Sequence, residues 1–185
     1  MDNDRKQRFL ALLEPVYPRL SRYALAMTRD RDDAKDLVSE SILAALERFD
    51  SLRSEAGFAG FLFRIALRTH RHARYRERMK VPFDERALAQ LEDGNASPER
   101  AGEMAIVLAA LDSLPKRMKE TVLLYDVADL SLEAIRAVQG GTLSGVKSRL
   151  RRGHETLRIL LGTEMEFPKR MGKKMLDREE VYAIS

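Results

Sequence analysis

Apolar side chains recur at helical spacing along most of the chain, and no convincing alternating pattern of a strand is found. Prolines stand at positions 15, 18, 82, 98, 115 and 168, so residues 19–81 contain none. Two apolar stripes in this stretch predict helices over residues 33–49 and about 58–78, each with one side in a core. The first stripe consists of Ala34, Leu37, Val38, Ser41, Ile42, Ala45 and Phe49, and the second of Phe58, Phe61, Leu62, Ile65, Ala66 and Ala73.

The second half of the chain carries another helical block. Helix starts are predicted at Ser113-Leu114-Pro115, where serine can cap and proline is tolerated in the first turn, and again at Ser131. Gly140-Gly141-Thr142 interrupts the pattern before a final helix over about 143–161. One side of that helix carries Val146, Leu150, Leu157 and Leu161.

The chain changes character between Pro82 and Met104, where six acidic residues stand against two basic ones. Residues 94–98 (GNASP) are a turn or linker signal within this segment. We therefore predict an all-α protein with two small helical domains joined by a flexible acidic linker. The predicted boundaries are residues 1–81, the linker 82–102, a second domain 103–162 and a C-terminal extension 163–185.

Basic residues are concentrated on the helix predicted over residues 58–78. Residues 64–80 contain seven basic side chains and one acidic one, within a chain of 185 residues whose formal net charge is +4. A row of guanidinium groups on one helix face can follow phosphates, and the aromatic rings of Phe63 and Tyr75 near its edge can stack on unpaired bases. A solvated charged face is the alternative. The row consists of Arg64, Arg68, Arg71, Arg74 and Arg78.

A helix–turn–helix pattern follows in the second block. Residues 131–138 would form its first helix, residues 140–142 its turn and residues 143–152 its second helix, which is rich in basic side chains. Such a second helix can lie in the major groove with its N-terminal residues at base edges. An ordinary helical hairpin is the alternative.

An acidic face is predicted on the helix over residues 33–49, away from its core stripe. Asp36, Glu40, Leu43 and Glu47 recur at i, i+4, i+7 and i+11. An exposed leucine flanked by acids is suited to docking on another protein, whereas a solvated face is the default.

Enzyme chemistry finds no support in the sequence, and no catalytic residue, metal or cofactor is predicted. There is no cysteine, and the three histidines lack metal-ligand spacing. His70 and His72 lie two apart on a helix, so we expect them at the rim of the basic face or in solvent. No apolar run approaches the about 18 residues of a membrane span, and the N-terminus lacks a signal-peptide core, so we expect a cytoplasmic protein without membrane insertion.

Two sets of motifs, in order, resemble the extracytoplasmic-function (ECF) sigma factors of bacterial RNA polymerase. Residues 33–46 (DAKDLVSESILAAL) and 57–68 (GFAGFLFRIALR) are similar to region two of the sigma-70 family. Residues 111–117 (LDSLPKR), 131–135 (SLEAI) and 146–153 (VKSRLRRG) are similar to region four. The resemblance covers roughly residues 9–80 and 103–161.

The resemblance implies a factor that binds core RNA polymerase and promoter DNA, usually under the control of an anti-sigma factor. Polymerase clamp helices would contact Asp36, Ser39, Glu40 and Leu43. The −10 element would be melted and bound by Phe61, Arg64, Arg68, Thr69, Arg71, Arg74, Tyr75 and Arg78. The −35 element would be bound by Ser144, Gly145, Lys147, Ser148, Arg149, Arg151 and Arg152. The same C-terminal domain would touch the polymerase flap.

Several positions depart from the family pattern. Arg68 stands where an asparagine is frequent, Phe61 where a tryptophan is usual, Arg136 where a small residue packs, and Gln139 where the family is apolar. Residues 143–146 (LSGV) replace the usual EGTV, and a glycine at 145 weakens a helix start by about 0.5–1 kcal/mol relative to alanine. These departures concern promoter recognition rather than polymerase binding.

Two other functions remain open at this point. A sigma-like mimic would sequester an anti-sigma factor without directing transcription, and a helix–turn–helix repressor would bind an operator without polymerase. The C-terminal extension is either disordered or a regulatory segment that docks on the sigma domains or on polymerase, as its apolar residues allow. The sequence does not distinguish whether the two domains are splayed apart or packed together.

Overall fold

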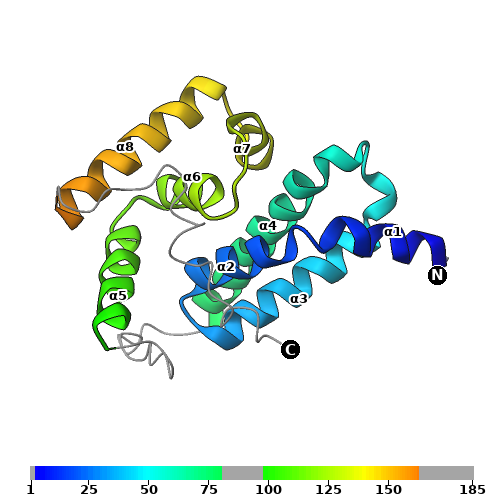
Figure 1. Ribbon diagram of the computed structural model, residues 1–185, viewed down its shortest axis with the longest axis horizontal. Coiled ribbons are helices and arrows are strands. Elements are labelled where there is room, and N and C mark those ends of the chain that lie inside the picture. The colour runs from blue at the N-terminus through cyan, green and yellow to red at the C-terminus, as the bar shows by residue number, and fades with distance from the viewer. Residues whose placement is uncertain (1–2, 81–97, 163–185) are drawn as a thin grey trace.

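The computed structural model describes residues 3–80 and 98–162, and every regular element within these ranges is a helix (Figure 1). The predicted all-α fold is therefore confirmed. The helices are α1 (Asn3–Leu13), α2 (Tyr17–Thr28), α3 (Arg31–Glu47), α4 (Phe58–Lys80), α5 (Pro98–Asp112), α6 (Lys116–Asp126), α7 (Leu132–Gln139) and α8 (Leu143–Leu161), with short 3₁₀ turns at Phe49–Ser51 and Glu55–Gly57.

The N-terminal group, α1–α4, packs α2 against α3 and α3 against α4. The side chain of Asp30 caps α3 by accepting hydrogen bonds from the backbone N–H groups of Asp32 and Asp33, both at 2.9 Å. The predicted helix over 33–49 thus begins earlier and ends at Glu47, while Phe49 turns inward from a 3₁₀ turn. There it meets Phe9 of α1 and Phe58 of α4 in edge-to-face contacts, which fasten α1 to the group.

The C-terminal group, α5–α8, packs around the long helix α8. Ser131 Oγ accepts from the N–H of Ala134 at 3.1 Å and starts α7, as predicted. Thr142 Oγ1 accepts from the N–H of Gly145 at 3.0 Å and starts α8. The predicted cap at Ser113 is wrong: its hydroxyl donates to Ala110 O at 2.7 Å and closes α5, while α6 begins after Pro115 without a side-chain cap.

The two groups pack directly on each other, which answers the question that the sequence left open. Helix α7 packs against α4, and α6 packs against α2 (Figure 1). Ala134 of α7 comes close enough to Gly60 of α4 that an added Cβ there would lie 3.9 Å away. Polar contacts support the same interface: Arg19 donates to Ala128 O at 3.4 Å, and Arg29 pairs with Asp112.

The predicted domain boundaries are not tested by this arrangement. Helix α5 begins at Pro98, inside the segment predicted as linker, and most of that segment and the whole extension 163–185 lie outside the described residues.

Candidate nucleic-acid and polymerase interfaces

The arginine row of α4 divides into exposed and engaged members. Arg64 and Arg68 are exposed, and within the described part of the chain no carboxylate pairs with either. Arg74 is exposed beside Glu77, with 3.2 Å between Nη1 and Oε2. Arg78 belongs to α4, but its side chain lies outside the described residues.

The aromatic neighbours of this row differ from one another. Tyr75 is 61% exposed and available for stacking, as expected. The prediction that Phe63 lies at the edge of the row is wrong. Its side chain is fully buried and packs edge-to-face on Tyr23 of α2, with 5.3 Å between the ring centroids. Phe61 and Thr69 are half-buried, and Phe61 lies beside Phe58.

A pocket of about 600 Å³ lies along the arginine face. Its walls are the side chains of Arg64, Arg68 and Arg71 on α4, together with Tyr75 and with Val138 of α7. The C-terminal group therefore borders the very surface on which we expect unpaired DNA bases.

Arg71 belongs to the arginine row, but its side chain contacts Glu120 of the C-terminal group. Its Nε donates to Glu120 Oε1 at 3.0 Å and its Nη2 to Glu120 Oε2 at 2.5 Å. Glu120 is 1% exposed, and its hydrogen bond to Arg71 raises the pKa of that guanidinium against the effect of burial. A role for Glu120 was not predicted from the sequence, although this residue shares the buried side of α6 with Leu123 and Leu124 at i+3 and i+4.

A buried polar network joins α6, α7 and α8 around Gln139. Gln139 Oε1 lies 2.9 Å from Thr121 Oγ1 and 3.1 Å from Arg149 Nη2, and the Gln139 carbonyl accepts from Arg117 at 2.8 Å. Arg149 also donates to Thr121 Oγ1 at 3.2 Å. The polar residue that departs from the family pattern is thus satisfied by partners, and Arg149 is directed into the protein instead of outward.

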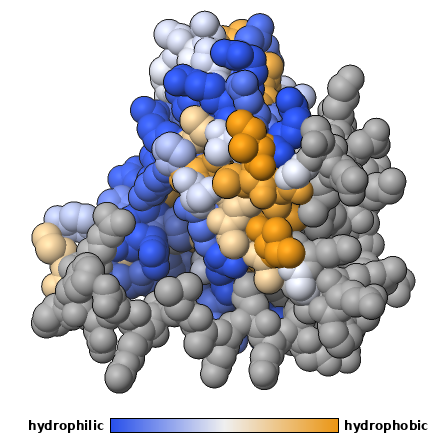
Figure 2. Space-filling model, turned by 90° about the vertical axis from the view of Figure 1, so that its left-hand side faces the viewer, coloured by the Kyte–Doolittle hydropathy of each residue, from blue (hydrophilic) through white to orange (hydrophobic). Residues whose placement is uncertain are grey.

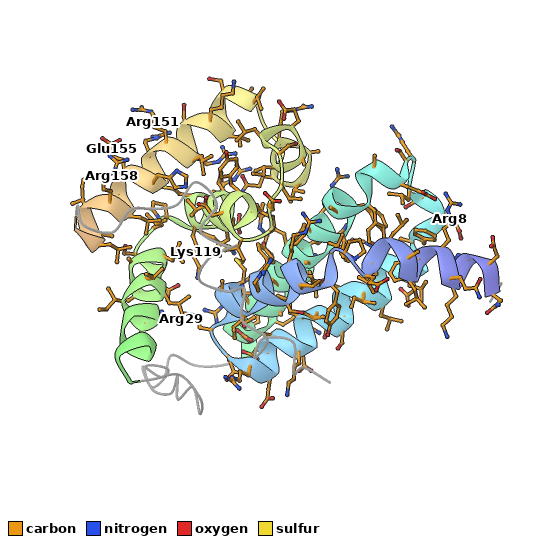
Figure 3. All side chains as sticks on the ribbon, viewed as in Figure 1. Arg8, Arg29, Lys119, Arg151, Glu155 and Arg158 are labelled. Atoms are coloured by element: carbon orange, nitrogen blue, oxygen red, sulfur yellow. The ribbon has the colours of Figure 1, made fainter. Side chains whose placement is uncertain are left out.

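The remaining predicted −35 residues lie on the outer side of α8. Ser144, Lys147, Arg151 and Arg152 are exposed, and Gly145 and Ser148 are half-buried near the start of the helix. Figure 3 shows Arg151 directed away from the body of the molecule, on the same side as Glu155 and Arg158.

The acidic face of α3 is exposed as the spacing predicted. Asp36, Ser39, Glu40 and Glu47 are exposed, and Leu43 is 59% exposed among them. The pKa of Asp33 on the same helix is raised, first by burial and then by Asp30, Glu77 and Asp36. Negative charge is therefore crowded at this end of the molecule, which favours a basic partner surface.

An exposed apolar patch lies where α5 meets the end of α8, and Figure 2 shows it as the orange area facing the viewer. Ile106 of α5 is 56% exposed, and Ile159 and Leu160 of α8 are 77% and 50% exposed. Exposed apolar side chains that gather in one place mark interaction surfaces more often than scattered ones do.

The prediction that His70 lies at the rim of the basic face or in solvent is wrong. This residue is 9% exposed, on the side of α4 that faces the C-terminal group. Burial, followed by the charges of Arg74, Lys116, Lys119 and Arg71, lowers its pKa from 6.5 to about 4. His72, by contrast, is exposed and accepts from Arg68 Nε at 3.5 Å.

The buried histidine predicts a pH dependence of stability. Between pH about 6.5 and about 4 the unfolded chain binds a proton at His70 that the folded chain does not, so the free energy of unfolding should decrease as pH falls through this window. Chemical denaturation at pH 7 and pH 5 should show a smaller decrease for His70→Phe than for the wild type. The matched change His72→Phe, at an exposed site, should keep the wild-type dependence; equal slopes in all three proteins would contradict the prediction.

Comparison with known proteins places this architecture in a family. A family model described as Sigma-70 region 2 matches residues 12–79, which span α2–α4 and the end of α1. The RNA polymerase sigma factor SigV of Bacillus subtilis is 29% identical over 143 residues, which cover 77% of this chain and 84% of SigV. The ECF RNA polymerase sigma factor EcfG of Rhodopseudomonas palustris is 28% identical over 144 residues, covering 78% and 80%.

The solved structures agree on the fold. The sigma factor RpoE from Bartonella quintana, in its complex with the anti-sigma factor NepR, superposes with a TM-score of 0.64 at 24% identity, covering 89% of this chain and 100% of that one. These likenesses support an ECF member of the sigma-70 family, with the region 2 domain over residues 12–79. Sigma factors of this family are regulatory DNA-binding proteins and not enzymes. No described helix is long and apolar enough to cross a membrane.

Proposed function

We propose that this protein directs core RNA polymerase to promoters by binding the −10 element through α4 and the −35 element through α8. The observation that carries the proposal is that Arg64 and Arg68 are both exposed beside the exposed ring of Tyr75, and that no carboxylate of the described residues pairs with either of them. Two guanidinium groups one helical turn apart suit the phosphates of one strand, and the ring suits an unpaired base. Capture of unpaired bases melts the duplex by differential affinity rather than by covalent chemistry.

The remaining surfaces would bind other parts of the polymerase and the promoter. The acidic face of α3 would bind the polymerase clamp, and the apolar patch of Ile106, Ile159 and Leu160 would bind the flap. At the −35 element, the exposed Ser144, Lys147, Arg151 and Arg152 would contact DNA, with the backbone approaching at Gly145 and Ser148. Arg149 would hold α8 in position against Thr121 and Gln139.

An anti-sigma factor is the proposed regulatory partner. The solved structures similar to this chain include sigma factors bound to anti-sigma factors. The packed arrangement of the two helical groups also brings their surfaces within reach of one small partner.

The test is run-off transcription with purified bacterial core polymerase and a genomic promoter library. Wild-type protein should yield specific transcripts, and the double variant Arg64→Ala, Arg68→Ala should lower their yield at least about tenfold, since each lost phosphate or base contact costs about 1 kcal/mol or more. The control is Lys6→Ala, Arg8→Ala, which removes the same charge from exposed positions of α1.

A second candidate, the sigma-like mimic, is favoured by the engagement of Arg71 and Arg149 inside the protein. It predicts stable binding to an anti-sigma factor together with no transcript from any promoter of the library. That pair of results would overturn the proposed activity in transcription initiation.

A further inference from the structure

Arg71 stands in the middle of the arginine face, yet both of its donating nitrogens point at a carboxylate from the other half of the molecule. The two hydrogen bonds to Glu120, at 3.0 and 2.5 Å, form a bidentate pair. The Arg71 side chain is 37% exposed, whereas Glu120 is 1% exposed. The pair therefore lies at the edge of the interface between α4 and the C-terminal group, with one partner still within reach of solvent.

The buried surroundings of Glu120 depend on this closed packing. Gln139 Nε2 is 3.5 Å from Oε2 of Glu120, and the same amide side chain contacts Thr121 and Arg149 of the C-terminal group. The hydroxyl of Tyr23 on α2 is buried without a hydrogen-bond partner among the described residues, and its pKa is raised by burial and then by Glu120. A buried hydroxyl without a partner is unfavourable, and it lies close enough to Glu120 for the carboxylate to affect its pKa.

We infer that the Arg71–Glu120 pair is an exchangeable latch that holds the two helical groups closed in the free protein and must open before α4 can bind promoter DNA. The inference depends on the proposed role of α4 in −10 binding. A guanidinium that donates two hydrogen bonds to a carboxylate can donate the same two to a phosphate, so a DNA strand competes with Glu120 for the donors of Arg71.

The location of the pair makes the latch reversible. A charge left unpaired inside one domain remains buried and is strongly disfavoured. Glu120 belongs to the C-terminal group and Arg71 to α4, so separation of the two groups lets both charges reach water. A second ionic contact across the interface, Arg29 with Asp112, lies at the end of α2. Figure 3 shows Arg29 and Lys119 approaching from the two groups, and both bind Asp112.

The latch can be tested by measuring the distance between the two groups in the full chain. The sequence has no cysteine, so spin labels at Gln7→Cys on α1 and Glu155→Cys on α8, both exposed positions, are the labels used. Glu120→Gln keeps the shape and removes the charge. It should shift the closed-to-open ratio by at least about tenfold toward longer distances. Glu133→Gln, an exposed carboxylate on α7, is the matched control and should keep the wild-type distances.

A second variant removes the pair from the other side. Arg71→Gln should also open the molecule, and circular dichroism should show that both variants keep their helix content. Short wild-type distances in both folded variants would overturn the latch.

Binding of a single-stranded −10 oligonucleotide separates the latch from the proposed function. Glu120→Gln should bind it at least about tenfold more tightly than wild type, whereas Arg71→Gln should open without this gain, because it has lost the DNA contact. Opening of both variants without any gain in DNA affinity would overturn the inference that the latch must open before α4 binds DNA. An equal gain in both variants would instead reject the assignment of Arg71 to the −10 element.

Discussion

Reversing the charges of Asp36 and Glu40 to lysine is expected to weaken binding of core RNA polymerase by about 100-fold or more. Close charge pairs across interfaces contribute about 1.5 kcal/mol or more each, and two of them correspond to about two factors of ten. The fold should be retained because both side chains are exposed. The core of α3 is formed by its opposite side, which carries Ala34, Leu37, Val38, Ser41 and Ala45.

The leucine on this face provides a second, uncharged change. Leu43 is 59% exposed, which is unusual for a large apolar side chain of a folded protein unless a partner covers it. Leu43→Ala should weaken polymerase binding by about tenfold at unchanged net charge and unchanged thermal stability. An effect of Asp36 and Glu40 alone would indicate long-range attraction, whereas an effect of all three indicates a contact surface.

Binding is measured by fluorescence anisotropy of labelled protein against purified core polymerase at two salt concentrations. The control is Asp4→Lys, Glu14→Lys, which makes the same change in net charge at exposed positions in and next to α1. Control and test variants that weaken binding equally would show that net charge, and not the α3 face, determines polymerase binding.

Burial within one helix was predictable from the sequence. The apolar stripes of α3 and α4 are buried or half-buried as predicted, because the angular position of a side chain on a helix follows from its residue number alone. The starts of α7 and α8 were predictable for the same local reason, since Ser131 caps the nearest free N–H groups and the Gly140-Gly141-Thr142 break places the start of the next helix.

Burial by a second helical group was not predictable in this way. Phe63 lies between the arginine row and the apolar stripe of α4, and only the presence of Tyr23 on α2 decides that it is core. His70 and Arg71 were expected to face solvent or DNA, yet α6 approaches this side of α4 and supplies Glu120, Lys116 and Lys119. Residue spacing within α4 carries no information about a helix that is about fifty residues further along the chain.

The same distinction, between burial set by one helix and burial by a second group, applies to the predicted site residues. Asp36, Glu40, Arg64 and Arg68 lie on faces that only their own helix determines, and they are exposed as their spacing indicates. Arg149 has the spacing of a DNA-facing residue, but a polar pair on α6 and α7 draws it inward. That pair, Thr121 and Gln139, could be suspected from a glutamine at a position where the family is apolar, because a buried amide requires partners.

Gly153→Ala is expected to lower the free energy of unfolding by about 1–3 kcal/mol, although alanine is the better helix former. A Cβ at position 153 would lie 2.6 Å from Val122 Cγ2 and 3.2 Å from Met118 Cγ on α6. Val122 is fully buried and β-branched, so its methyl group cannot turn away as the end of a flexible side chain could. The clash therefore outweighs the about 0.5–1 kcal/mol that replacing a mid-helix glycine would otherwise contribute.

Two further variants isolate this cause. Gly102→Ala makes the same chemical change in α5, where an added Cβ meets no atom within 4 Å, and should raise the free energy of unfolding by up to about 1 kcal/mol. Adding Val122→Ala to Gly153→Ala removes the clashing methyl groups, so urea denaturation should show a double variant more stable than the two separate losses predict. A Gly153→Ala protein as stable as wild type would mean that α6 and α8 can move apart. In that case the close crossing of α6 and α8 would not fix the position of the exposed side of α8, where we propose that DNA binds.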